Sequence, residues 1–305
     1  MKKIVLITSF AEYHLLECLI PNVIDTINPN KIIISEGKMP IGPENKGFHD
    51  VDEFNQKWTF EGKGIVGFDW LETKSLEEKY KGLVEVREMK YDSNLTATEC
   101  YIQSITHSDL KESDLVFCLE SDSFLYEGDK ELLHLELSKL NIGQGLSIKY
   151  VDFLETQFYT ENINILQPKY RRFVYKFDNL ENYQKRMGSG YLTQNYPELK
   201  KIDSFFTRHY CWWRPNNYKQ LRYDLIKRSD QYWKDFEVGL QEIRKMSQRY
   251  ANYLKPNSDG TINMNMMIPL EKILIRPSRQ DEARWVKFID CEHPNAIKNH
   301  PNFVK

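Results

Sequence analysis

The chain has 305 residues and a formal net charge of −2, with 41% hydrophobic and 28% charged residues. This length fits one large domain or a core domain with an appendage, and the composition excludes intrinsic disorder and small disulfide-stapled scaffolds. No apolar run approaches the ~20 residues of a membrane span, so we expect none. The opening apolar run is too short for an export signal, and the five cysteines lack CxxC spacing. We therefore expect reduced thiols in a cytoplasmic protein.

The charge is unevenly distributed along the chain. Residues 1–166 contain 16 Lys and Arg against 29 Asp and Glu, a balance of −13. Residues 167–305 contain 26 against 15, a balance of +11. Two halves with net charges of opposite sign can steer a charged partner, or they can attract each other. We expect an anionic ligand or acceptor at the second half, with mutual attraction of the halves as the alternative.

The first elements alternate between strand and helix patterns. A buried-strand pattern covers 4–8, apolar residues at helical spacing follow over 12–27, and a second strand pattern covers 31–37. Together they predict a βαβ unit. Because parallel strands in such units present their carboxyl ends to a ligand, we expect residues 8–12 and 35–38 to line a site.

The middle of the chain continues this alternation after residues 38–75, which lack sustained periodicity and form a loop long enough to be functional. Further strands and helices are expected at these places: strands at 83–89, 114–119 and 145–154, and helices from Ser75, over 94–105 and over 131–140.

The second half is less regular. Residues 165–215 mix short β-like pieces with turns, 217–254 are expected to be helical, and five prolines mark a wrapping tail after 255. The sequence therefore predicts an α/β fold with a mainly parallel sheet flanked by helices. Its domains would be a catalytic domain at 1–215 and an α-helical extension with the tail at 216–305.

Two carboxylates follow an apolar strand pattern. Glu120 and Asp122 flank Ser121 directly after the predicted strand at 114–119. A turn at that point would aim both carboxylates at a shared position. Such hard oxygen ligands suit Mg²⁺ or Mn²⁺ bound to a diphosphate. A solvated acidic turn is the alternative.

The order of these features resembles the nucleotide-sugar-dependent glycosyltransferases of the GT-A fold, especially family-2-like members. Residues 4–36 resemble the first part of that family, and LVFCLESDSFL at 115–125 stands where it has a strand ending in the DxD motif. The resemblance implies a Rossmann-like sheet and transfer of a sugar from a nucleoside diphosphate sugar, above all a UDP-sugar, to a hydroxyl acceptor. Here the first acid is Glu, the second strand ends in Ser-Glu-Gly, and the QxxRW motif of processive synthases is absent.

The resemblance also implies roles for individual residues. Residues just after the first strand would lie at the nucleotide base: Thr8, Ser9 and Phe10. Glu36 would lie near the uridine or ribose, and Glu120 and Asp122 near the ribose, the phosphates and the metal. His209 resembles the late histidine that completes the metal site in many members, and imidazole is an acceptable ligand of Mn²⁺. A packed histidine among aromatic residues is the alternative.

Basic and acidic residues later in the chain could complete the chemistry. Arg208 and Arg214 suit neutralisation of a diphosphate leaving group, although plain ion pairing explains them equally well. Inverting transfer needs a general base for the acceptor hydroxyl. Asp152 and Glu155 follow the acidic pair by one strand, and their spacing does not decide which of them faces the site.

The sequence leaves two candidates for the acceptor: hydroxymethylated DNA, as some bacteriophages use, and a glycan. Residues 205–255 contain 11 Lys and Arg against 5 Asp and Glu, interleaved with aromatic rings. Nucleic-acid-binding surfaces use such residues, although helix packing explains the rings as well. The Lys-, Asn- and Tyr-rich composition favours a bacterial or phage source. The alternatives are a nucleotidyltransferase, whose usual Gly-rich basic loop is replaced here by residues 8–12, and a non-enzymatic nucleic-acid-binding protein.

Overall fold

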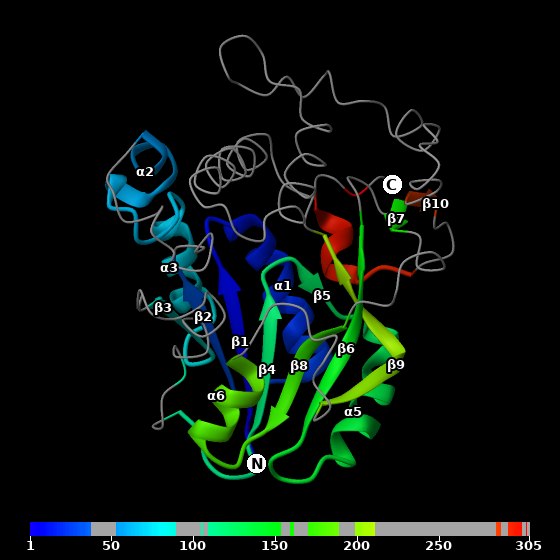
Figure 1. The fold of residues 1–305 in the computed structure, drawn as a ribbon. Helices are drawn as coiled ribbons and strands as arrows, with labels where there is room; N and C mark the ends of the chain where they lie inside the picture. The colour runs from blue at the N-terminus through cyan, green and yellow to red at the C-terminus, as the bar shows by residue number, and fades with distance from the viewer. Residues whose placement is uncertain are drawn as a thin grey trace, which may run out of the picture.

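A computed structural model describes the following residues: 1–37, 53–89, 105, 109–153, 159–161, 170–188, 199–210, 285–287, 292–300 and 303. Their centre is a mixed, mostly parallel sheet of eight strands with helices on both faces (Figure 1). The predicted α/β class is confirmed. Among the described residues, no helix is both long and apolar enough to cross a membrane.

The sheet has the order β3-β2-β1-β4-β8-β6-β9-β5. Its strands have these bounds: β1 Lys3–Ser9, β2 Lys31–Glu36, β3 Val84–Glu88, β4 Leu115–Glu120, β5 Ser123–Phe124, β6 Gly145–Asp152, β8 Tyr170–Lys176 and β9 Leu199–His209. Only β8 and β5 run antiparallel to their neighbours in it. A separate antiparallel pair joins β7 (Tyr159–Glu161) to β10 (Trp285–Lys287).

The direction in which strands are added reverses at β1, because β2 and β3 lie on one side of it and β4 on the other. In open α/β sheets, ligands bind outside the carboxyl ends of the strands at such a switch point. The strands β4, β6 and β9 run in the same direction as β1, so their last residues lie along the same edge. The topology alone therefore locates the candidate site.

Helices cover both faces of the sheet. The helical segments have these bounds: α1 Tyr13–Ile27, α2 Glu53–Trp58, η2 Phe60–Gly62, α3 Trp70–Lys79, η3 Glu127–Asp129, α5 Lys130–Ser138, α6 Leu180–Gly188 and η5 Asn295–Asn299. Residues of α1, α3 and α5 belong to one core cluster, and residues of α6 belong to the other. The amphipathic stripe predicted at 12–27 is confirmed, since Leu15, Leu19 and Val23 are fully buried.

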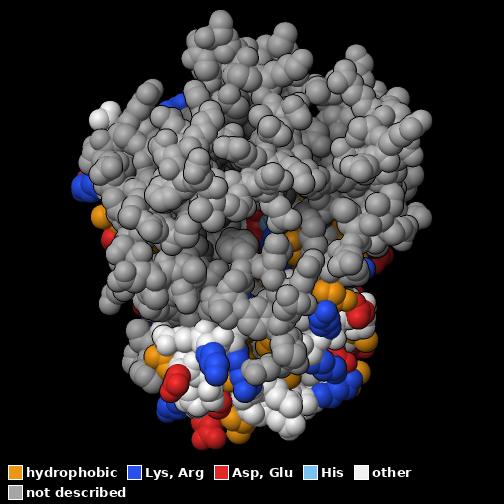
Figure 2. Space-filling model, viewed as in Figure 1, with side chains coloured by type: hydrophobic (Ala, Val, Ile, Leu, Met, Phe, Trp, Pro, Cys, Tyr) orange, Lys and Arg blue, Asp and Glu red, His pale blue; other side chains and the backbone are white. Residues whose placement is uncertain are grey.

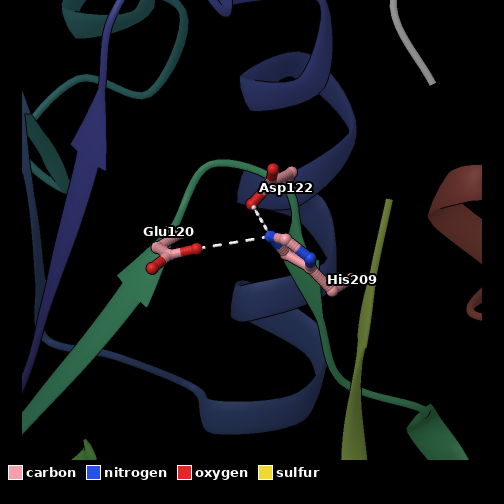
Figure 3. A group of neighbouring side chains, drawn as sticks. All are labelled: Glu120, Asp122 and His209. Atoms are coloured by element: carbon pink, nitrogen blue, oxygen red, sulfur yellow. Dashed lines mark ion pairs between the residues drawn. The ribbon is translucent and has the colours of Figure 1, made fainter. Parts of the chain in front are cut away.

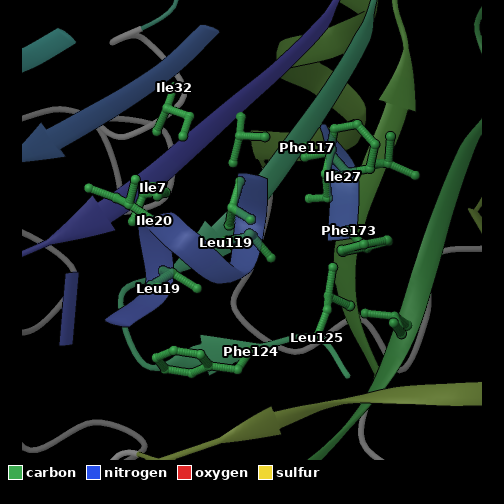
Figure 4. Packing of buried hydrophobic residues seen from close by; sticks show 14 of the residues in the cluster. Ile7, Leu19, Ile20, Ile27, Ile32, Phe117, Leu119, Phe124, Leu125 and Phe173 are labelled. Atoms are coloured by element: carbon green, nitrogen blue, oxygen red, sulfur yellow. The ribbon is translucent and has the colours of Figure 1, made fainter. Parts of the chain in front are cut away.

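The two core clusters follow from strand alternation. In β1, Val5 and Ile7 face the α1 side, whereas Ile4 and Leu6 face the α6 side. Figure 4 shows Ile7 packed with residues of α1, β2 and β4. Burying one such aliphatic side chain contributes about 1.5–3 kcal/mol. The core therefore fixes β1 and β4 firmly beneath the site.

Some predicted elements need correction. The helix expected from Ser75 begins at Trp70, and only Thr73 and Leu76 are buried in it, so its sequence shows little periodicity. Helix α6 lies where only β-like pieces and turns were expected. The helices predicted at 94–105 and 217–254 lie outside the described residues apart from residue 105, and so the α-helical extension stays a prediction.

The described end of the chain packs against α1. Ile297 in η5 is fully buried in the same core cluster as α1, and Phe303 is packed against that cluster. On the described part of the face in Figure 2, acidic and basic side chains are mixed near the end where β1 and β4 begin. The boundary predicted at residue 215 stays a prediction.

Candidate metal centre

Three potential metal ligands meet at the carboxyl edge of the sheet (Figure 3). Glu120 is the last residue of β4, Asp122 lies in the turn between β4 and β5, and His209 is the last residue of β9. The short strand β5 pairs with β9 so that Ser123 stands opposite His209. A histidine 87 positions after Asp122 is thus brought to the acidic turn by strand pairing.

The geometry of this group is tight. Nε2 of His209 lies 2.8 Å from Oδ1 of Asp122 and 3.3 Å from Oε2 of Glu120. One ligand atom from each of the three side chains lies within 4.8 Å of the others. Asp122 and His209 are buried, whereas the side chain of Glu120 is 28% exposed. The group therefore reaches the surface on the side of Glu120.

Backbone and side-chain hydrogen bonds fix the acidic turn. The Ser121 amide donates to the carbonyl of Thr8 (3.1 Å), and the Tyr210 amide donates to the carbonyl of Asp122 (2.8 Å). The Ser121 hydroxyl also donates to the carboxylate of Glu12, just before α1. The turn is thus tied to β1, to the end of β9 and to α1, which holds its carboxylates in place before any ligand binds.

A second layer surrounds Glu120 and His209. The Tyr150 ring stands edge-on to the His209 ring, with centroids 5.9 Å apart. Arg171 pairs with Oε2 of Glu120, and its guanidinium carbon lies 4.0 Å from the centroid of the Tyr150 ring. Burial by itself raises the pKa of Glu120, but the charge of Arg171 and the hydrogen bond from His209 lower it overall. Glu120 is therefore ionised at neutral pH, as a metal ligand must be.

These residues fit a divalent cation. Two carboxylates and one imidazole supply hard oxygen and borderline nitrogen donors from three separate elements, within the distances above. Mn²⁺ accepts both kinds of donor, and Mg²⁺ favours the carboxylates. The predicted ligands Glu120, Asp122 and His209 thus form one group that could hold a metal ion.

The residues predicted at the nucleotide base are the last two of β1, Thr8 and Ser9, and the next residue, Phe10, at the same edge. Thr8 is in register with Glu120 of β4, and Ser9 is in register with Glu36 of β2. Ser9 and Phe10 are both buried. The backbone of this segment therefore lies beside the metal centre, and its contact with a nucleotide stays a prediction.

Glu36 is fully buried at the end of β2. Its Oε1 accepts the backbone N–H of Ala11 (2.9 Å) and of Gly67 (3.2 Å). Ala11 has a left-handed φ of 54°, and a Cβ on Gly67 would lie 2.5 Å from the Ala11 nitrogen. In this structure Glu36 thus fastens the segment after β1 to Gly67. Its predicted contact with the uridine or ribose stays a prediction.

The remaining predicted residues lie at different places. Asp152 is the last residue of β6 and is in register with His209, so its backbone lies at the site edge. Arg208 is buried and donates from Nε to the carbonyl of Glu292 (2.6 Å), so the structure does not bring it to the metal centre. Glu155 and Arg214 lie outside the described residues. Their roles stay predictions.

Sequence reasoning does not identify two neighbours of the centre. The sequence pattern predicts a β-like segment at Arg171 and a strand at Tyr150, but it gives neither residue a role at the site. Their position follows from the insertion of antiparallel β8 between β4 and β6. No local pattern signals that insertion, because Arg171 and Glu120 lie 51 positions apart in the chain.

Comparisons with known proteins give distant similarities only. Neither a scan against protein-family models nor a search of curated proteins finds a match. The crystal structure of S. aureus TarS 1–349 is 8% identical over 83% of this chain and 71% of that chain, with a TM-score of 0.34. A second structure of S. aureus TarS is 10% identical over 92% and 50%, with a TM-score of 0.31. That of mannose-1-phosphate geranyltransferase from Thermus thermophilus is 11% identical over 81% and 68%, with a TM-score of 0.29.

Proposed function

We propose that the chain is a metal-dependent glycosyltransferase of the GT-A type, which moves a sugar from a nucleoside diphosphate sugar to a hydroxyl acceptor. The observation that supports this most is the group of Glu120, Asp122 and His209 at the carboxyl edge, next to the switch point between β1 and β4. That position is where an α/β sheet binds a nucleotide, and the donor set suits the cation of a diphosphate.

Each part of the site has a proposed task. Glu120, Asp122 and His209 would hold Mn²⁺ or Mg²⁺, and the bound cation would neutralise the negative charge on the departing diphosphate. The end of β1 with Thr8 and Ser9, and Phe10 directly after it, would position the nucleotide, and UDP is the first candidate.

The acceptor side needs a group that takes the proton of the attacking hydroxyl. We propose Asp152 for this role, because its backbone is in register with His209 at the site edge. Glu155 is the second candidate. The acceptor is hydroxymethylated DNA or a glycan, and a steep loss of acceptor affinity with added salt would favour DNA.

The first test is a thermal-shift screen of the whole chain with UDP-sugars, UDP, nucleoside triphosphates and a single-stranded oligonucleotide, each with and without Mn²⁺. A ligand at a hundred times its Kd stabilises the folded state by about 2.7 kcal/mol. We expect stabilisation by a UDP-sugar that depends on Mn²⁺. Stabilisation by a triphosphate alone would favour a nucleotidyltransferase, and stabilisation by an oligonucleotide alone would favour the nucleic-acid-binding alternative.

A matched pair of variants assigns the effect to the centre. Asp122→Asn removes one anionic ligand without changing the size of the side chain, so we expect loss of Mn²⁺-dependent stabilisation and of sugar transfer. Asp25→Asn makes the same change at an exposed position on α1 and should behave as the wild type. Full transfer by Asp122→Asn would contradict the assignment.

A further inference from the structure

Arg171 contacts the metal centre without belonging to its donor set. Its guanidinium pairs with Oε2 of Glu120, the same oxygen that lies 3.3 Å from Nε2 of His209. It also stacks on the Tyr150 ring, which stands edge-on to His209. Tyr150 is 7% exposed, whereas the Arg171 side chain is 20% exposed. Arg171 is thus held by a buried ring at the more open side of the centre.

The charges of the group show what Arg171 changes. Glu120 and Asp122 contribute −2 and Arg171 contributes +1, so with a neutral His209 the group carries −1. A divalent cation would bring this to +1. Without Arg171 the same sums are −2 and 0. Arg171 therefore opposes cation binding and leaves an excess positive charge once a cation is present.

Arg171 can pair with Glu120 before a cation binds and can be available to an anion afterwards, because the cation and Arg171 are both attracted to Glu120. A cation bound at Oε2 of Glu120 would weaken the pairing with Arg171, because it draws on the same oxygen and repels the positive charge of the guanidinium. The released N–H donors would still be held near the centre by stacking on Tyr150. A guanidinium fork matches two oxygens of a phosphate, and such charge-assisted pairs are among the stronger hydrogen bonds.

We propose that Arg171 is the anion-binding residue of this centre. It pairs with Glu120 before the cation binds and with phosphate oxygens of the ligand afterwards. The inference rests on the proposed function and extends it, because it names the residue that recognises the diphosphate and makes metal and anion binding depend on each other.

The test compares Arg171→Gln with Arg172→Gln in the full chain. Arg172 is the next residue of β8, and it interacts with Cys118 and Tyr183 in the other core cluster, so its replacement removes the same charge away from the centre. Calorimetry first measures binding of Mn²⁺ alone and then of inorganic pyrophosphate at saturating Mn²⁺. One unit charge within a few ångströms of a partly exposed site is worth a tenfold change or more.

We expect Arg171→Gln to bind Mn²⁺ roughly tenfold more tightly and pyrophosphate roughly tenfold more weakly than the wild type. Arg172→Gln should match the wild type in both. Equal or weaker Mn²⁺ binding by Arg171→Gln, or unchanged pyrophosphate binding, would overturn the proposal. If the wild type and Arg171→Gln both fail to bind Mn²⁺, the proposed function itself falls.

A second variant keeps the test decisive if Arg171→Gln does not fold. Arg171→Lys retains the charge but loses the fork and most of the stacking. Its Mn²⁺ affinity should stay near that of the wild type while its pyrophosphate affinity falls severalfold. Pyrophosphate binding equal to that of the wild type would overturn the role of the guanidinium.

Discussion

Glu36 is a carboxyl group that the fold has removed from water completely. Two backbone amides, from Ala11 and Gly67, donate to one of its oxygens. Burial first, and then the nearby carboxylate of Asp69, raise the pKa of Glu36 to about 8. Asp69 in turn accepts the backbone N–H of Tyr13, at the start of α1. Two neighbouring buried carboxyls thus hold the segment between β1 and α1.

Glu36 makes stability depend on pH. In the unfolded chain a glutamate titrates near pH 4.3, so between about pH 4.3 and 8 the folded chain keeps a proton that the unfolded chain releases. Its contribution to stability is therefore full at low pH and declines as the pH rises through this window. Glu36→Gln stays neutral at all pH values. Its free energy of unfolding relative to that of the wild type should therefore rise by about 1.4 kcal/mol or more between pH 5 and pH 8.

Urea denaturation at the two pH values measures this difference in the free energy of unfolding. Glu78→Gln, at an exposed position on α3, is the control and should leave the difference between variant and wild type unchanged. A difference between Glu36→Gln and the wild type that stays constant from pH 5 to pH 8 would show that Glu36 is ionised in the folded chain throughout this range.

At the scale of elements, the metal centre depends on how strand ends are aligned. Glu120, Asp152 and His209 each end a strand, and the three strands run in one direction. The sequence predicted β1, β2 and β4 well because their apolar runs are buried on both faces. It could not predict that β8 would insert between β4 and β6, because that pairing joins segments far apart in the chain. For this reason the sequence predicts the three residues of the candidate metal centre but not the pairing of Glu120 with Arg171.

The segment between β1 and α1 offers a prediction at this scale. A Cβ on Gly67 would lie 2.5 Å from the Ala11 nitrogen, too close for any real contact. Gly67→Ala should therefore push residues 9–12 away from Glu36 and destabilise the fold by about 1–3 kcal/mol. If Thr8, Ser9 and Phe10 contact the nucleotide, UDP-sugar affinity should fall severalfold while Mn²⁺ affinity stays near that of the wild type.

Gly82→Ala provides the control. Gly82 has a φ of +81°, and a Cβ at this position would have no atom within 4 Å, so its replacement strains the backbone but displaces nothing. It should lower stability without changing the affinity for UDP-sugar. Equal UDP-sugar affinity in Gly67→Ala and the wild type would place the nucleotide elsewhere.

Across the described part of the molecule, several acids of the first half pair with Lys or Arg of the second. Such pairs are Arg171–Glu120, Lys200–Glu136 and Arg208–Asp129. These contacts support the alternative that the uneven charge attracts the halves to each other. Exposed pairs contribute only about 0–1 kcal/mol each, so the partly buried pairs at the centre matter most. Of these pairs, Arg171–Glu120 lies at the candidate metal centre.

The described residues from 292 onward pack against α1. Ile297 is fully buried against α1, the Asn295 amide donates to Glu127 (2.9 Å), and the Glu292 carbonyl accepts from Arg208. Arg208 directly precedes His209 of the candidate metal centre, so this docking supports the end of β9 from one side. Residues 292–300 are therefore a structural part of the core that carries the candidate metal centre.

Ile297→Ala tests this support. Removing a fully buried isoleucine side chain costs about 2–5 kcal/mol, so the melting temperature should drop clearly. Because Glu120 and Asp122 are fixed by β1, α1 and β4, Mn²⁺ affinity should fall only slightly at temperatures where the variant is folded. Ile65→Ala, at a 40% exposed position, should change neither quantity appreciably. If Ile297→Ala has the stability of the wild type, residues 292–300 do not pack on α1 in solution. The support that this segment gives to His209 through Arg208 would then be absent.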